Sequence, residues 1–253
     1  MMPPTSFLKS GLILTFTLGA WTSGMTSAKC EHKNFASEDR SLDKWSTFMG
    51  RDVENLQGDD LGKVTELALD MKNGRILAVI ISTGGFLGLD REMVGVPPGA
   101  FTNFKAGGEH GTLLLDSTRE NFKAAPNFKK SEWASYFQVD HSALLFRYFK
   151  VLPYFQVSKG ELSGMSLGPV KSTREVLGLP IRDKQHILGN VTAIRVDSAS
   201  QRLMYMVVTD DLSISSKFEI LASEVQLNAA QNALEFDVSK QAGSGFRQPT
   251  LGR

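Results

Sequence analysis

The chain has 253 residues, of which 42% are hydrophobic, 22% charged and 9% aromatic. These proportions are typical of globular domains and exclude a wholly disordered or fibrous protein. The 28 Lys and Arg residues nearly balance the 27 Asp and Glu residues. The overall charge therefore gives no indication of nucleic acid, an anionic membrane or an acidic substrate as the dominant partner. The length suits two modest domains.

Residues 1–28 have the three parts of a secretory signal: Lys9, an apolar core over residues 11–21, and small residues that end at Ala28. The core has roughly half of the 20 or so apolar residues that a membrane-spanning helix needs. We therefore predict a bacterial protein that is periplasmic or secreted, with its signal peptide cleaved after Ala28. The alternative is an uncleaved anchor or a buried N-terminal helix. Cleavage removes Lys9, the one charged residue of the segment, and leaves basic and acidic residues equal in number.

Cys30 is the only cysteine of the chain, so a disulfide within the chain is excluded. Its place just after the signal would suit a lipoprotein, whose acylated cysteine follows a small residue and has an apolar residue three positions before it. Lys29 and Ser27 occupy these positions instead. We favour a soluble exported protein with a free thiol, and whether Cys30 is modified stays open.

Residues 29–44 are polar and aperiodic, which is typical of a flexible tether. Order is expected to begin near Trp45. Apolar positions in 62–70, the Asn73-Gly74 dipeptide and the β-branched run at 75–83 predict a hairpin.

Two short strands, each bounded by Gly or Pro, are predicted at 93–97 and 112–116. Ser117 and Glu120 have the spacing of a capping box. They predict a short helix that ends before Pro126.

The same pattern recurs later in the chain. LGKVT at 61–65 corresponds to LGNVT at 188–192, an offset of 127 residues, and further blocks align at offsets of 124 and 121. The offset only shrinks, as loop shortening produces. The sequence therefore predicts two copies of one β-rich unit, at 45–126 and 172–240, and two small barrels suit their size better than a solenoid.

Residues 127–171, which we call the connector, are the most aromatic part of the chain. Trp133, Tyr136 and Phe137 have helical spacing, so one face of this helix is expected to pack on a barrel. A stacking surface for single-stranded nucleic acid is a weaker alternative, since the surrounding chain lacks a basic field. A membrane-binding amphipathic helix is a further alternative. Residues 159–172 are expected to form a Gly- and Ser-rich linker, and the tail at 241–253 is expected to be disordered.

The motifs of the first unit resemble the PRC-barrel family, named for the photosynthetic reaction centre H subunit and shared with a ribosome maturation factor. They are GRDV at 50–53, GDDLGKV at 58–64, GGFLG at 84–88, VGVP at 94–97 and NFKAAP at 121–126. The resemblance implies an all-β barrel of about six strands used for protein contacts, with no family-wide catalytic set. The second unit lacks the glycine-rich loop and the terminal Ala-Ala-Pro, so its assignment depends on the internal repeat. The expected fold is all-β: two tandem small PRC-type β-barrels joined by an aromatic-rich, partly helical connector.

Signatures of metal and phosphate binding are missing from the sequence: there is no His-Glu-x-x-His or Walker loop. The four histidines are far apart and in dissimilar contexts, which is typical of surface residues; they are His32, His110, His141 and His186. Cys30 and His32 lie in the expected tether, which cannot hold reacting groups in register. Each of the repeated acids follows a strand, where Asp favours turns or caps; they are Asp70, Asp116, Asp197 and Asp237. We expect no catalytic, metal-binding or cofactor-binding residues.

The candidate partner-binding residues are Phe86 and Leu87, at the tip of a glycine-rich hairpin, and the connector aromatics Trp133, Tyr136 and Phe137. The alternative for Phe86 and Leu87 is that they fold back onto the barrel. The leading hypothesis is a non-enzymatic exported adaptor that docks on another envelope protein through barrel loops and connector. The alternative is a binder of a small apolar or lipid ligand in a cleft between the barrels, lined by connector aromatics. An enzyme ranks third, nucleic acid is not expected as a partner, membrane contact is not favoured, and oligomeric state stays open.

Overall fold

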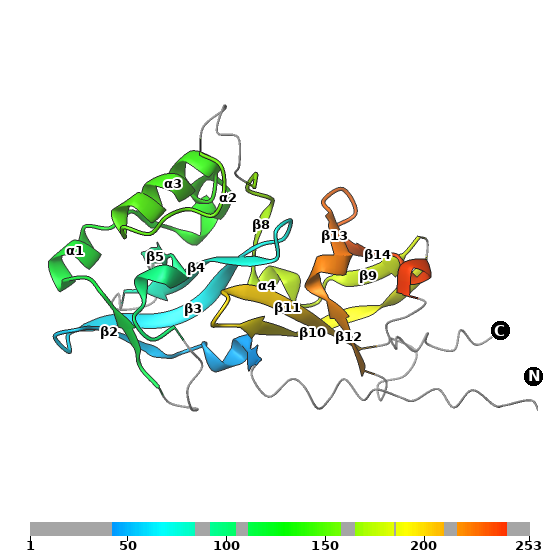
Figure 1. Cartoon of the computed structure of the whole chain (residues 1–253), viewed down its shortest axis with the longest axis horizontal. Coiled ribbons are helices and arrows are strands. Elements are labelled where there is room, and N and C mark those ends of the chain that lie inside the picture. Colours follow the sequence, from blue (N-terminus) through cyan, green and yellow to red (C-terminus); the bar gives the residue numbers. More distant parts are fainter. Residues whose placement is uncertain are drawn as a thin grey trace, which may run out of the picture. The chain divides into compact units, whose positions relative to one another are not determined.

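The structure is a computed structural model that describes residues 42–83, 92–104, 111–157, 165–184, 186–209 and 217–241 (Figure 1). The expected signal peptide, most of the expected tether and the hairpin tip with Phe86 and Leu87 lie outside the described residues. All fourteen strands of the described part belong to one hydrogen-bonded sheet. The fold is therefore mostly β, with short helices.

The first half of the sheet contains the expected hairpin, made by β3 (Asp60–Asp70) and β4 (Arg75–Ser82). The expected strands near 93–97 and 112–116 are also present, as β5 and β6. The remaining elements are β1 (Asp43–Lys44), η2 (Trp45–Thr47), β2 (Asp52–Asn55), β5 (Met93–Val96), η3 (Pro98–Ala100), β6 (Leu113–Leu115) and α1 (Arg119–Lys123). The strands lie in the order β6-β2-β3-β4-β5, with β2 and β6 parallel and the other neighbours antiparallel.

The connector adds a short edge strand and helices to this half. Its elements are β7 (Asn127–Phe128), η4 (Lys130–Glu132), α2 (Trp133–Tyr136) and α3 (Val139–Tyr148), and β8 (Val170–Ser172) follows as the strand that begins the second half. β7 pairs with β5, and Figure 1 shows α2 and α3 over β4 and β5. The helical spacing of the aromatic residues thus predicted real helices.

The second half contains a longer hairpin and a similar set of short elements. They are α4 (Thr173–Val176), β9 (Pro180–Asp183), β10 (His186–Asp197), β11 (Arg202–Thr209), β12 (Lys217–Leu221), η5 (Ala222–Glu224), β13 (Val225–Asn228), β14 (Ala233–Phe236) and η6 (Val238–Gln241). β10 pairs with β9 and β11, β11 with β12, and β14 runs parallel to β9 as β6 does to β2. The two halves therefore share one order of strand pairing.

Two glycines 127 residues apart occupy the same unusual place in the two hairpins. Gly62 has φ +131° and Gly189 has φ +146°. A Cβ on Gly62 would lie 2.3 Å from the carbonyl oxygen of Ser82, and one on Gly189 would lie 2.2 Å from that of Thr209. Only glycine fits where the neighbouring backbone approaches so closely, which explains the glycine in each copy of the LG-x-VT pattern.

The two halves exchange strands at their junction. β1 pairs with β10 of the second half, and β8 pairs with β3 of the first half. β4 also meets β11, where the Ile76 amide donates to the Gln201 carbonyl and the Leu203 amide donates to the Gly74 carbonyl, at 3.0 Å each. Ile76 and Leu203 are corresponding residues at the offset of 127, and so are Gly74 and Gln201. Each bond is therefore the counterpart of the other, as in the isologous contact of a two-fold dimer. Asp43 and Lys44 are therefore part of the sheet, which corrects the expected end of the tether at residue 44.

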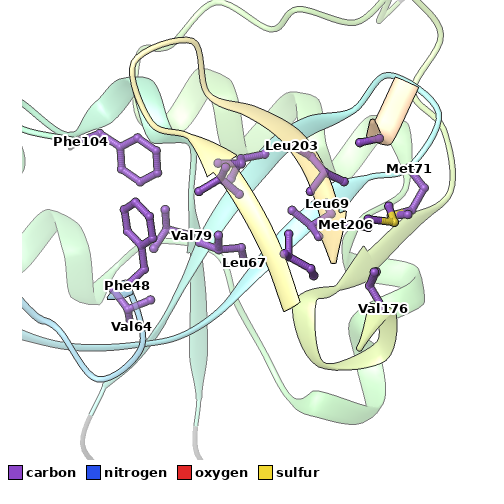
Figure 2. Packing of buried hydrophobic residues seen from close by; sticks show 14 of the residues in the cluster. Phe48, Val64, Leu67, Leu69, Met71, Val79, Phe104, Val176, Leu203 and Met206 are labelled. Carbon is purple, nitrogen blue, oxygen red and sulfur yellow. The ribbon is translucent and has the colours of Figure 1, made fainter. Parts of the chain in front are cut away.

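One hydrophobic core joins both halves. Figure 2 shows Leu67 and Leu69 of β3 near Leu203 and Met206 of β11, with Val176 of α4 at one side. A buried aliphatic side chain contributes about 1.5–3 kcal/mol. The halves cannot separate without exposing such residues to water.

The expected closure of the barrels is not confirmed, because the strand ladders follow an open path from β13 to β6. In the first half the chain after β5 meets β6 through a single bridge, between Phe101 and Leu115. Pro97 and Pro98 precede that bridge, and proline has no amide hydrogen for a ladder. The strand is interrupted there by η3.

The helix α1 begins one residue later than its capping pattern predicts. The N-cap is Thr118, whose hydroxyl accepts from the Asn121 amide at 3.2 Å, and not Ser117. A full capping box occurs instead at α4, where Ser172 and Glu175 bond reciprocally to each other's amides. The helix does end before Pro126, as expected.

Candidate functional site

The structure brings the three connector aromatics of the expected site together around Phe128. The Phe128 ring stacks on the Tyr136 ring, with centroids 4.0 Å apart and an angle of 24° between the planes. The rings of Trp133 and Phe137 form T-shaped contacts with Phe128, with centroid distances of 5.9 and 5.7 Å. Phe128 comes from β7, which pairs with β5. The aromatic cluster therefore attaches the connector to the first half.

Tyr136 fixes the cluster on the sheet through its hydroxyl. The hydroxyl donates to the Pro126 carbonyl at 2.8 Å and accepts from the Gly95 amide at 3.4 Å. A Cβ on Gly95 would lie 3.2 Å from Tyr136 Cε1, so glycine makes room for the ring. Burial raises the pKa of Tyr136 to about 12, against the smaller lowering effect of the Gly95 bond. The phenol is neutral at physiological pH and acts as a structural donor.

The aromatic cluster packs on small and aliphatic residues of the hairpin, namely Ala68, Leu77, Ala78 and Ile80. Tyr136 is 9% exposed and Phe137 is 4% exposed, whereas Trp133 is partly buried. These residues therefore use most of their apolar area inside the molecule, in agreement with a helix that packs on the sheet. Partner binding through them, and through Phe86 and Leu87, stays a prediction.

A buried carboxylate, that of Asp70, ties the connector to the tip of the same hairpin, and the sequence had indicated only its place in a turn. Asp70 is fully buried. Its carboxylate accepts from the backbone amides of Lys72 and Asn73 at 3.1 and 3.2 Å, from the Asn73 side chain at 2.7 Å and from the Tyr154 hydroxyl at 3.0 Å. Gly168 lies against it, because a Cβ there would be 2.7 Å from Asp70 Oδ1. Four donors and no exposure make this carboxylate a clamp for chain segments and leave it no access to a substrate.

Tyr154 is held on its other side by a cation. The Arg75 guanidinium carbon lies 4.9 Å from the Tyr154 ring centroid, which is cation–π geometry. Burial, and next the Asp70 charge, raise the pKa of Tyr154 far above its ordinary value. The tyrosine therefore stays protonated and keeps donating to Asp70.

The matching acid of the second half makes a simpler turn. Asp197 accepts from the amides of Ala199 and Ser200 at 2.9 and 3.3 Å and from the Ser200 hydroxyl at 2.6 Å. The Ser200 hydroxyl bond is the main reason why the pKa of Asp197 is lowered. The interpretation of Asp70 and Asp197 as turn residues after strands is thus confirmed.

A small hollow of about 270 Å³ lies where α2 meets the linker before β8. Phe137, Val139, Leu167 and Pro169 are among its lining residues. Of the aromatics expected to line a ligand cleft, Phe137 borders this hollow, while Tyr136 contacts the sheet. A cleft between barrels lined by the connector aromatics therefore does not describe this hollow.

The residues considered for chemistry do not converge in the described part of the chain. His141 is exposed, with Nδ1 2.9 Å from the Ser135 carbonyl oxygen, and His186 is exposed on β10. Cys30, His32 and His110 lie outside the described residues. Among the residues with assigned positions, no three His, Cys, Asp or Glu side chains are grouped to hold a metal ion. In the same part of the chain, no helix has the length and apolarity to cross a membrane.

Comparison with known proteins finds that one stretch of this fold is similar to a known family. No curated protein matches the chain. The region with the GRDV, GDDLGKV and VGVP motifs, which forms β2 to β5, falls within a family match. Residues 42–119, from the start of the described chain to the first residue of α1, match the PRC-barrel domain, the family that these motifs resemble.

Proposed function

We propose that this protein is a non-enzymatic exported adaptor that docks on another envelope protein through barrel loops and connector. The proposal takes the PRC-barrel match at residues 42–119 as its starting point, because the resemblance implies a barrel used for protein contacts. It also includes the export and the cleavage after Ala28 that the N-terminal sequence predicts.

We further infer that residues 172–240 form a second PRC-type unit, so that the adaptor has two barrels in tandem. The shared strand order, the paired glycines Gly62 and Gly189, and the interchangeable bonds at Ile76 and Leu203 support this inference. The exchanged strands β1 and β8 would then hold the two units in one orientation. A fixed orientation favours binding, because less conformational freedom is lost when a partner docks.

The observation that carries the adaptor proposal is the exposure of aliphatic side chains at the places where docking is expected. Leu56 follows β2 at the β2–β3 turn and is 52% exposed, and Ile187, near the corresponding β9–β10 turn, is 50% exposed. Leu144 on α3 of the connector is also 50% exposed. Apolar side chains at the edge of a rigid scaffold are suited to partner contacts.

The test is affinity purification from envelope extracts with crosslinking, comparing the wild type with a variant that carries Leu56→Ser, Leu144→Ser and Ile187→Ser. We expect the main crosslinked protein to fall by about tenfold or more in the variant, since hot-spot losses of this size follow truncation of a few apolar contacts. A second variant, Phe86→Ser with Leu87→Ser, tests the glycine-rich hairpin. Lys123→Ser, at an exposed position of α1, is the matched control.

Undiminished capture by both variants would contradict docking through these positions, provided that their circular dichroism and Tm match the wild type. Intact mass of the exported protein tests the localisation separately. A mass that begins at Lys29 supports cleavage after Ala28, and a retained Met1 contradicts it.

A further inference from the structure

A groove lies at the C-terminal end of α3, on a part of the connector that the aromatic cluster does not use. Its volume is about 450 Å³, within the roughly 300–1,000 Å³ range of ligand pockets. The lining combines two cations, Arg147 and Lys150, with the apolar residues Val151, Leu152, Pro153 and Val157. Leu152 is 91% exposed, the most exposed large apolar side chain in the described part of the chain.

The charge of the groove has one sign. Its lining contains no Asp or Glu. Arg147 and Lys150 are both exposed, and neither forms an ion pair within the part of the chain that the structure describes. An anion that entered the groove would meet two cations that no carboxylate of the described lining offsets.

Lys150 occupies a backbone position that usually belongs to glycine. The Val151 amide donates to the Phe146 carbonyl at 2.9 Å and the Lys150 amide to the Arg147 carbonyl at 3.1 Å, which is the Schellman pattern of a helix end. Lys150 holds the left-handed position of this motif with φ +56°. A side chain in this conformation is less stable than glycine, because its Cβ crowds the backbone. The helix end thus keeps a lysine where a glycine would be more stable.

The apolar side of the groove is fixed to the first half. A Cβ on Gly99 of η3 would lie 3.0 Å from Val151 Cγ1, so Val151 packs closely on this element. The Schellman bonds fix Lys150 and Val151 relative to α3. The cations and the aliphatic residues therefore have a defined arrangement before any ligand arrives.

We propose that this groove binds an anionic amphiphile. Arg147 and Lys150 hold its carboxylate or phosphate head group, and Val151, Leu152 and Val157 contact its aliphatic chain. A free fatty acid and the acidic lipid of a membrane share this chemistry. The site is separate from the aromatic-lined cleft expected from the sequence, and it does not depend on the adaptor function, because its lining differs from the positions tested there.

The first experiment is a calorimetric titration of the full chain with decanoate below its micellar concentration, with decan-1-ol as the uncharged control. We expect saturable binding of decanoate and at least about tenfold weaker binding of decan-1-ol, since the alcohol has no charge for the two cations. Decanoate affinity should also fall as salt is raised. Equal affinities for the two compounds would overturn the proposal.

The second experiment uses a matched pair of glycine variants. Lys184 is an exposed lysine with φ +53°, in the β9–β10 turn and not in the groove. Lys150→Gly and Lys184→Gly should each raise Tm slightly, because both relieve a left-handed side chain. Only Lys150→Gly, and likewise Arg147→Ala, should weaken decanoate binding by about tenfold. Unchanged binding in Lys150→Gly overturns the proposal, and a raised Tm in that variant excludes misfolding as the cause of lost binding.

Vesicles of phosphatidylglycerol and of phosphatidylcholine distinguish the source of the amphiphile. Co-sedimentation with phosphatidylglycerol alone, lost in Lys150→Gly, supports a membrane lipid as the ligand. Decanoate binding without co-sedimentation supports a free amphiphile. Failure to bind decanoate and both kinds of vesicle overturns the site and leaves the adaptor proposal untouched.

Discussion

The hairpins β3–β4 and β10–β11 have the same strand pairing but different outer faces. β4 is buried at seven of its eight positions, whereas burial in β11 is confined to Leu203, Met206 and Val208. Two pairs of corresponding residues show this difference. In the first half, Ala68 and Gly95 lie under the connector. The corresponding residues of the second half, Arg195 and Glu219, form an ion pair at 2.7 Å with side chains 28% and 38% exposed.

The covering of the first hairpin explains this difference. Tyr136 and Leu145 would meet a Cβ on Gly95 at 3.2 and 3.4 Å, so this face accepts only small or apolar residues. In the described part of the chain α3 packs on β5, whereas the helical segment with the most contact to β11 is the short η5. Charged residues on a water-facing sheet also oppose unwanted pairing. The two hairpins thus share one pattern of strand pairing but have different outer faces. The face that the connector covers is apolar, and the other face is charged.

The largest expected effect comes from exchanging residues between the two faces. Gly95→Glu places a carboxylate under Tyr136 and Leu145, and should lower the free energy of unfolding by more than about 4 kcal/mol, as expected for a buried unpaired charge with a steric clash. Glu219→Gly removes a partly exposed ion pair and adds a strand glycine, and should cost only about 1 kcal/mol. Urea denaturation measures both. Similar losses in the two variants would refute the contrast between the faces.

Alkaline pH provides a second test of the covered face. The pKa of Tyr136 is raised to about 12 in the folded protein. The neutral phenol therefore makes its full contribution to the free energy of unfolding below the unfolded pKa near 10, and this contribution is lost as pH rises through 12. The free energy of unfolding should therefore fall by roughly 2–3 kcal/mol from this group over that range. Tyr136→Phe should be less stable than the wild type at pH 7, because it loses the hydroxyl bonds, and the gap should close or reverse by pH 12. A gap that is independent of pH would count against the buried, neutral phenol.

The two hairpins share a glycine at the same position, so substitution of either glycine should destabilise the protein equally. Gly62→Ala and Gly189→Ala each put a Cβ against a carbonyl oxygen of the adjacent strand, in a backbone conformation that only glycine adopts easily. Each should cost about 1–3 kcal/mol, measured by thermal and urea unfolding. A large loss for one variant and none for the other would show that the two hairpins are not equivalent.

The smallest effect concerns Asp197 at the exposed turn. Its folded pKa is lowered from 3.8, mainly by Ser200, so its stabilising contribution is present above about pH 4 and is lost as pH falls through the lowered value. Since Asp197 is only partly buried and solvent screens its charge, the change should stay below about 0.5 kcal/mol. Ser200→Ala should flatten this acid dependence in urea titrations between pH 5 and 2. An equally steep dependence in Ser200→Ala would assign the effect to other carboxylates.

Sequence patterns predicted the local elements well. The Asn73-Gly74 turn, the β-branched run of β4 and the helical spacing of Trp133 and Tyr136 each correspond to an element of the expected kind. The repeat at 61–65 and 188–192 predicted two hairpins with matching registers. These features depend on neighbours in the chain, which a sequence displays directly.

The candidate site was less accessible to sequence reasoning. Trp133, Tyr136 and Phe137 were expected on a helix, but their burial around Phe128 depends on β7 lying beside β5. The pairing of Tyr154 with Asp70 joins residues 84 positions apart, and no local pattern indicates such a contact. The groove beside Arg147 and Lys150 could have been suspected from two cations next to an apolar turn, but its volume depends on how Val151 packs against η3.

The sequence by itself determined where strands, turns and helices form, because these properties follow from periodicity and from the backbone preferences of Gly, Pro and Asn. The tertiary structure decided that β1 and β8 cross to opposite halves, that the ladders stay open, and that one outer face is covered while the other is not. These outcomes depend on contacts between residues that are distant in the sequence. The free energy of such contacts is set by burial and by the space available, and a local sequence pattern indicates neither of these.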